Sequence, residues 1–243
     1  MGREDVMNAF MKTRVVSAAF IISALQVAEA HTAFTVNSTT GNPYAGATYF
    51  ATINVGHGCE VVGIADKFDT EKLEIEIPEN AQTTSTRPLD ASWGKAQIVK
   101  TGSAITKLVW SKAPGVTPES SDSYLYRVNF NVKMPSTPWA TLKFKATQTC
   151  HNGTAETYQV WDGAEGPTLY VLPARQPGWN KYTIPAGITL DLSTPTAAGT
   201  PFFKDAQIVW SGNAAYSPNT ETASRITDKL TTIPAGAEIW VKY

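Results

Sequence analysis

Apolar and polar residues alternate along several short stretches of the chain, with the period of two that is typical of half-buried β-strands. In "LEIEIP" the apolar residues Leu73, Ile75 and Ile77 alternate with Glu74 and Glu76. We therefore expect the two glutamates to form a solvated strand face and not a catalytic pair. The stretches that alternate in this way are residues 48–55, 71–78, 105–111, 124–135 and 141–149.

Residues that favour turns (Gly, Pro, Asn and Asp) separate these stretches. Short strands at such a spacing predict an all-β fold, an antiparallel β-sandwich. A proline-containing break at residues 172–180 divides the sandwich, residues 31–173, from a C-terminal extension, residues 174–243. Within the extension, residues 219–230 predict the one helix, with Asn219 or Thr220 as its N-terminal cap.

The extension is also rich in aromatic residues. These would pack it onto the sandwich or form a surface for a partner, and we prefer the first interpretation. They include Phe202, Phe203, Trp210, Tyr216, Trp240 and Tyr243.

The first thirty residues have the three parts of a secretory signal peptide. A positive start is followed by an apolar run, residues 15–25, and by small residues at Ala28 and Ala30. The apolar run is shorter than the roughly 20 residues that span a bilayer, so cleavage is favoured over a membrane anchor. We expect cleavage after Ala30, a periplasmic or secreted mature protein that begins at His31, and no membrane span in it.

The position of the true start is left open, because Met1, Met7 and Met11 are all plausible.

A formal net charge of −1 gives no electrostatic case for nucleic acid as a partner. The two cysteines, Cys59 and Cys150, would meet an oxidising compartment after export. We interpret them as one disulfide, whose loop of about 90 residues would be worth about 4 kcal/mol. The alternative, a pair of thiolate metal ligands, is disfavoured by export and by the absence of a CxxC spacing.

A histidine at the processed N-terminus would carry both a free amine and an imidazole. The amine has a pKa near 8, and the two nitrogens of His31 could fill adjacent corners of the tetragonal geometry that Cu(II) prefers. One carboxylate and one water could fill the others. A disulfide would gather His57, Glu60 and His151 close together, although each histidine could equally be an ordinary polar residue.

Six stretches in order resemble the YcnI-type copper-binding domain family, which consists of exported bacterial proteins encoded near copper-uptake and copper-resistance functions. The resemblance covers about residues 31–173. It is carried by "HTAFTVN", "GATYFATINVGHGCE", "LEIEIPEN", "SWGKAQIV", "LVWS" and "CHNG".

This resemblance implies an Ig- or cupredoxin-like β-sandwich and one Cu(II) per chain in a monohistidine brace. His31 would be the bidentate ligand and Glu60 the acidic one. His57 and His151 lie in no resembling motif, but the disulfide would bring them near these ligands, so they are candidates for the groups beside the ligands. The family places a tryptophan next to the copper, and here the chain departs from the pattern. Trp161 fits after an insertion, Tyr158 is the alternative, and Trp161 could also be a core aromatic.

These features predict an exported copper-binding protein of trafficking, buffering or homeostasis, and not an enzyme. A copper transporter or copper chaperone would be its partner. Two alternatives stay open. One is a copper-dependent monooxygenase, which would need His57 or His151 to complete a three-nitrogen histidine brace. The other is a metal-free interaction module.

Overall fold

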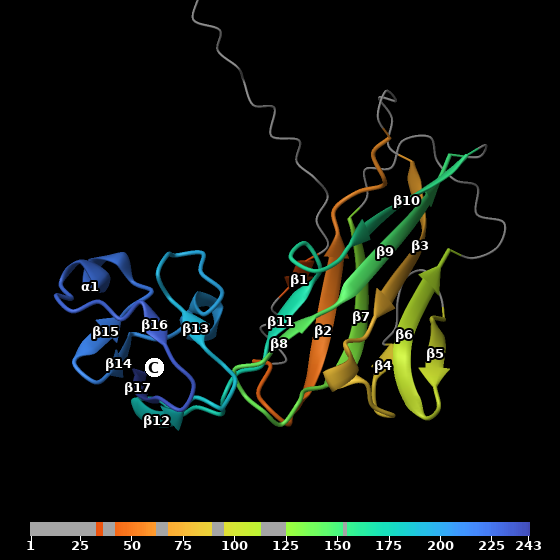
Figure 1. The fold of residues 1–243 in the computed structure, drawn as a ribbon. Coiled ribbons are helices and arrows are strands. Elements are labelled where there is room, and N and C mark those ends of the chain that lie inside the picture. Colours follow the sequence, from red (N-terminus) through yellow and green to blue (C-terminus); the bar gives the residue numbers. More distant parts are fainter. Residues whose placement is uncertain (1–32, 36–41, 62–67, 89–94, 113–124, 153–154) are drawn as a thin grey trace, which may run out of the picture.

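The computed structural model describes residues 33–35, 42–61, 68–88, 95–112, 125–152 and 155–243. Two units lie side by side (Figure 1), one built from β1 to β11 and the other from β12 to β17. The first unit is the antiparallel β-sandwich that the alternating stretches predict, so the expected fold class is confirmed.

The sandwich consists of two larger antiparallel sheets and a small two-stranded one. The first sheet has the order β1 (Ala33–Thr35), β2 (Thr48–Val55), β7 (Tyr126–Lys133), β4 (Arg87–Pro88). The second has the order β10 (Glu156–Trp161), β9 (Lys145–His151), β3 (Asp69–Glu76), β6 (Ala104–Ser111), β5 (Gln97–Thr101). The third pairs β11 (Thr168–Tyr170) with β8 (Thr141–Lys143), and a 3-10 turn, η1 (Glu79–Ala81), follows β3.

The inward-facing residues of both larger sheets make one continuous apolar core. In β2 the buried residues Ala51, Ile53 and Val55 alternate with more exposed ones, as a half-buried strand requires. Phe130 of β7 lies with its ring centroid 6.0 Å from that of Phe144 and nearly edge-on to it. The period of two therefore sets which side chains enter the space between the sheets.

Glu74 and Glu76 lie on the outer face of β3, as predicted. The Glu74 carboxylate is 3.0 Å from Lys107 Nζ and 3.3 Å from Lys72 Nζ, and Glu76 is 3.2 Å from Lys145 Nζ. Partial burial acts to raise the pKa of the Glu74 carboxyl, but the hydrogen bonds from Lys107 and Lys72 outweigh burial and lower that pKa. These ion pairs lie partly exposed at the surface, so each adds little to stability.

The predicted disulfide is present. Cys59 and Cys150 are joined across 91 residues with their Cα atoms 5.9 Å apart, and both are buried. Cys59 follows β2 of the first sheet and exchanges two backbone hydrogen bonds with Phe68, and Cys150 belongs to β9 of the second. The bond therefore ties the two sheets together at one end of the sandwich.

The C-terminal unit has a four-stranded antiparallel sheet, a two-stranded one and two short helical turns. Its larger sheet has the order β12 (Trp179–Thr183), β17 (Glu238–Lys242), β14 (Ile208–Ser211), β15 (Ala214–Tyr216). The smaller sheet pairs β13 (Leu190–Asp191) with β16 (Thr232–Ile233). The turns are η2 (Thr200–Phe203) and α1 (Thr220–Ser224).

The helix expected over residues 219–230 is much shorter than predicted. Asn219 caps α1 as expected, since its side chain accepts a hydrogen bond from a backbone N–H of the first turn. After Ser224 the chain leaves the helix, because residues 228 and 230 form backbone hydrogen bonds with Ala215 of β15. Among the described residues, no helix has the length and apolar character needed to cross a membrane.

Trp139, from the segment between β7 and β8, lies in the core of the C-terminal unit. Its ring centroid is 5.7 Å from that of Phe202, 5.3 Å from that of Phe203 and 5.6 Å from that of Tyr182. Trp139 has a φ of 68°, a conformation that a bulky side chain rarely adopts. The cost is offset because its N–H donates to the Val171 carbonyl and its ring is buried among aromatic rings.

Replacing both cysteines by serine should lower the free energy of unfolding by about 4 kcal/mol, because the loop they close is long. Urea denaturation of the oxidised protein and of the Cys59→Ser/Cys150→Ser variant measures this difference. Two free thiols in protein taken from its native compartment would contradict the disulfide in the cell.

Trp139→Ala should cost about 3–5 kcal/mol, because it removes a large ring from the core of the C-terminal unit. Trp139→Gly should recover about 1 kcal/mol of that loss, since glycine adopts a positive φ without the penalty of other residues. Denaturant unfolding checks both values. The control is Trp179→Ala, an exposed indole whose removal should change stability by no more than about 0.5 kcal/mol. Equal stability of the alanine variant and the unaltered protein would show that the second core does not need this side chain.

Candidate functional site

The end of the sandwich that carries the disulfide also carries most of the residues predicted to form a site. His57 and Glu60 lie on the segment that follows β2, on either side of Cys59. His151 is the last residue of β9, directly after Cys150, and it lies opposite Asp69 of β3 and Glu156 of β10. The disulfide thus brings two segments about 90 residues apart to the same place.

His57 and Glu60 form a close pair of potential metal donors in this region. The His57 Nε2 atom is 3.7 Å from the Glu60 Oε1 atom. The other ring nitrogen, Nδ1, is 2.6 Å from the Gly58 carbonyl oxygen, which can only accept, so Nδ1 carries a proton. In the neutral ring the lone pair is then on Nε2, which faces the carboxylate. One nitrogen and one oxygen donor are therefore directed at the same space.

A buried glutamine that the sequence did not single out holds this segment in place. Gln148 of β9 is fully buried, and its Nε2 atom donates to the His57 carbonyl at 2.8 Å and to Thr70 Oγ1 at 2.7 Å. Its Oε1 atom has no hydrogen-bond partner in the described part of the chain. The sequence did contain a signal, because Gln148 continues the inward series Leu142, Phe144 and Ala146 as a polar residue on an apolar face.

A buried ion pair lies beside His151 and was also not anticipated. The Asp69 carboxylate accepts from the Lys112 ammonium, and the Tyr126 hydroxyl donates to the same oxygen at 3.1 Å. A buried carboxylate needs such partners to remain charged. Because Asp69 is already held by two donors, it acts here as a structural anchor between β3 and β7.

The two candidate near-metal aromatics lie on opposite faces of β10. Trp161 is 5% exposed and packs in the core of the sandwich, whereas Tyr158 is 68% exposed on the outer face. Thr157 lies opposite Cys150, and Trp161 is four residues further along the strand, about 13 Å away. Tyr158 is the next residue after Thr157, so it lies closer to the disulfide end.

His31, the residue on which the predicted copper site depends, and the cleavage site before it lie outside the described residues. Within the residues that are described, no group of three His, Cys, Asp or Glu side chains is close enough to hold a metal ion. His57 and Glu60 do fit a part of a tetragonal N,O site, because they offer one imidazole nitrogen and one carboxylate oxygen.

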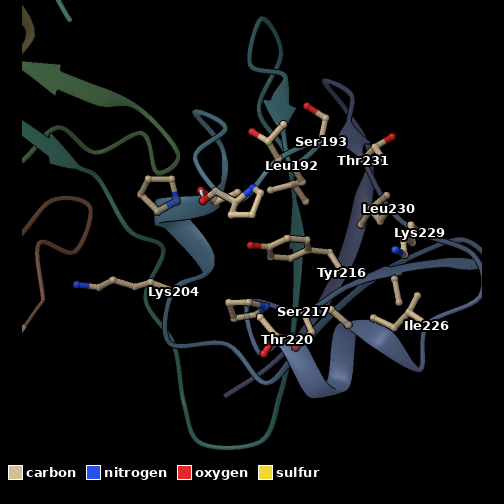
Figure 2. Close-up of a pocket in the computed structure, with 17 residues that line it drawn as sticks. Leu192, Ser193, Lys204, Tyr216, Ser217, Thr220, Ile226, Lys229, Leu230 and Thr231 are labelled. Carbon is tan, nitrogen blue, oxygen red and sulfur yellow. Dashed lines mark hydrogen bonds between the residues drawn. The ribbon is translucent and has the colours of Figure 1, made fainter. Parts of the chain in front are cut away.

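A separate pocket of about 450 Å³ lies in the C-terminal unit (Figure 2), between α1, η2 and the start of β16. Its walls are mainly apolar, with Leu192, Ile226 and Leu230 among them. The ring of Tyr216 projects into the pocket, and burial raises the pKa of its hydroxyl. None of the residues proposed for the copper site lines this pocket.

The chain can be compared with known proteins by structure and by sequence. The chain is similar to an uncharacterized protein from Nocardia farcinica, whose crystal structure is described as revealing an immunoglobulin-like fold. The two are 18% identical, with a TM-score of 0.42, and the match covers 58% of this chain and 97% of that one. No match is found among curated proteins.

The residues that form the sandwich also match a family by sequence. That family is described as "Domain of unknown function (DUF1775)", and its sequence pattern matches residues 34–168. The matched range runs from the second residue of β1 to the first residue of β11, and it includes the disulfide, His57, Glu60 and Gln148. Since this range is more than half of the chain, the protein belongs to the DUF1775 family.

Proposed function

We propose that this protein is an exported copper-binding protein of the YcnI type, which holds one Cu(II) at its processed N-terminal histidine. It would serve in copper trafficking, buffering or homeostasis. Copper would be its cargo, and a copper transporter or copper chaperone would exchange the ion with it.

The register of β1 is the observation that carries the proposal. β1 is antiparallel to β2, with Ala33 opposite Asn54. Following β1 back toward His31 therefore leads in the same direction as following β2 on toward His57 and Glu60. His31 is two positions before Ala33, with only Thr32 between them, so the two Cα atoms can be at most about 7 Å apart. This register favours a site that combines the mature N-terminus with Glu60.

The residues at this end have the chemistry that such a site needs. The free amine and imidazole of His31 would supply two nitrogens, and Glu60 would supply a negatively charged oxygen. The disulfide fixes the segment that carries Glu60, and Gln148 fixes the carbonyl of His57. The Gly58 carbonyl accepts from His57 Nδ1, which leaves His57 Nε2 facing Glu60, beside the proposed ligands.

Glu60 is partly exposed and not enclosed, with about a third of its side chain accessible. An exposed carboxylate can exchange with an incoming ligand from another protein, which suits a carrier better than a sealed structural site. This is the reason for preferring trafficking or buffering over a permanent cofactor.

A copper-dependent monooxygenase is a second candidate, favoured by the direction of His57 Nε2 toward Glu60. If His57 joined the amine and imidazole of His31, three nitrogens would bind the metal. Counting the nitrogens bound to Cu(II) separates this reading from the monohistidine brace.

Copper binding should require a free N-terminus at His31. We expect the processed protein to bind one Cu(II), and a form with one extra residue before His31 to bind far more weakly, because an amide nitrogen gives up its proton much less readily than an amine. Glu60→Gln should also weaken binding, by at least about 10- to 100-fold, the usual cost of removing a group that merely orients a ligand. Electron paramagnetic resonance with Cu(II) titration measures affinity and nitrogen count together.

The matched control is Glu79→Gln, which changes an exposed glutamate of η1, just beyond the far end of β3, and should leave Cu(II) binding unchanged. Equal binding by the processed and extended forms would rule out the brace. Three equatorial nitrogens, reduced to two by His57→Ala, would move the assignment to the monooxygenase.

The near-metal aromatic can be identified by fluorescence. The register of β10 places Tyr158 nearer than Trp161 to the disulfide end. Trp161→Phe should therefore change the quenching of tryptophan fluorescence by Cu(II) only slightly. Tyr158→Trp should add an indole that the paramagnetic ion quenches strongly. Loss of most of the quenching in Trp161→Phe would instead make Trp161 the aromatic beside the copper.

A further inference from the structure

Three exposed tryptophans come together on the outer face of the C-terminal sheet. Trp179 of β12, Trp240 of β17 and Trp210 of β14 are 52%, 47% and 41% exposed. The chain has seven tryptophans in all. Large aromatic side chains normally bury most of their surface, so three exposed indoles on one unit of a protein call for an explanation.

The strand register places these indoles next to one another. Trp210 lies directly opposite Trp240 in the neighbouring strand, and Lys181 lies opposite Trp240 on the other side. Trp179 is two residues before Lys181 on β12, so it points to the same face. The alternate residues Val209, Ile239 and Val241 point the other way and are buried in the second core. The three tryptophans therefore form a row across three strands.

We name this row the tryptophan platform (Trp179, Trp210 and Trp240). It lies on the outer face of the four-stranded C-terminal sheet. The Cα atoms at its ends lie two strands and two residues apart, about 12 Å by the usual spacings of a sheet. None of its members lines the pocket of Figure 2. A ligand of the platform must accordingly be extended and must present a flat face.

Charged groups are interleaved with the indoles. The Lys181 ammonium is 2.7 Å from the Glu238 carboxylate and 5.9 Å from the centre of the Trp240 ring. Lys242, directly opposite Trp179, adds a third charged residue. The platform thus offers aromatic faces for apolar contact and, beside them, both donors and acceptors of hydrogen bonds.

We propose that the tryptophan platform binds a polysaccharide chain. A pyranose ring has an apolar face of C–H groups and a rim of hydroxyls, and this combination matches an indole face with a lysine and a glutamate next to it. A chain of such rings is extended and flat, as a row of indoles across a sheet requires. The proposal does not depend on copper. It gives the C-terminal unit a role of its own, attachment of the protein to a cell-wall or surface polysaccharide.

The other partners fit the platform less well. A lipid bilayer would have to accept Glu238, which is exposed on the same face and would lose its water. The centre of a protein–protein interface is depleted of charged residues, whereas here Lys181 lies over the Trp240 ring and Lys242 lies opposite Trp179. The experiment below can detect binding to a membrane or to a second copy of the chain.

The test measures binding of the full processed protein to three insoluble polysaccharides: cellulose, chitin and purified peptidoglycan. We expect the unaltered protein to be removed from solution by at least one of them. Trp210→Ala, Trp240→Ala and Trp179→Ala should each weaken that binding about tenfold or more. Cellulose and chitin are uncharged β-linked chains and peptidoglycan carries acidic groups, so the pattern of binding identifies the source.

Three controls keep the result specific. Phe50→Ala removes an exposed aromatic from the sandwich and should bind as before. Trp240→Tyr should retain much of the binding, while Trp240→Leu should lose it, because stacking needs an aromatic face and not only apolar surface. Unchanged unfolding curves show that each variant is folded.

Several outcomes would overturn the proposal. One is failure of the unaltered protein to bind any of the three polysaccharides. Another is equal binding by the tryptophan variants. Binding to phosphatidylcholine–phosphatidylglycerol vesicles that depends on the tryptophans, without binding to polysaccharide, would assign the platform to a membrane surface. A tryptophan-dependent dimer in analytical ultracentrifugation, again without polysaccharide binding, would assign it to a second copy of the chain.

Discussion

Cys59 follows the last residues of β2 in one sheet, and Cys150 lies in β9 of the other, so a single covalent bond fixes the spacing of the two sheets at one end of the sandwich. Everything proposed for the copper site rests on that end. Apolar packing between the sheets would hold the middle of the sandwich without the bond. At the end, Cys59, Cys150 and Phe68 form a small buried cluster separate from the main core, with Val61 packed against it. The cross-link and this cluster together order the segment that carries His57 and Glu60.

The same end of the sandwich is unusually polar inside. Gln148 and Gln159 lie opposite each other on β9 and β10, and each has a buried side-chain oxygen with no hydrogen-bond partner in the described part of the chain. Buried polar groups of this kind reduce stability when they are left unpaired. Of the two, Gln148 holds the backbone at His57 through its amide group, while the apolar core elsewhere carries the fold.

The sequence was a good guide to local structure and a poor one to long-range packing. Residues 48–55 alternate cleanly, and β2 has those bounds. The stretch 141–149, by contrast, divides at Phe144 into β8 and β9, which pair with different strands, and nothing in its alternation distinguishes the two halves. The disulfide between Cys59 and Cys150 could be predicted, because the chain has only two cysteines and a predicted export signal. The role of Gln148 could not, because its partners are set by tertiary contacts.

Trp139 has a consequence for the order in which the chain can fold. Its ring is part of the second core, yet Trp139 precedes β12 by forty residues in the sequence. During synthesis from the N-terminus, Trp139 therefore leaves the ribosome before the rest of that core. The backbone N–H of Trp139 donates to the Val171 carbonyl, which places the ring at the edge of the sandwich. We therefore expect the core of residues 174–243 to be completed only after this edge has formed. On this basis the sandwich would act as a template on which the C-terminal unit assembles last. The two units are coupled in folding even though their sheets share no strand.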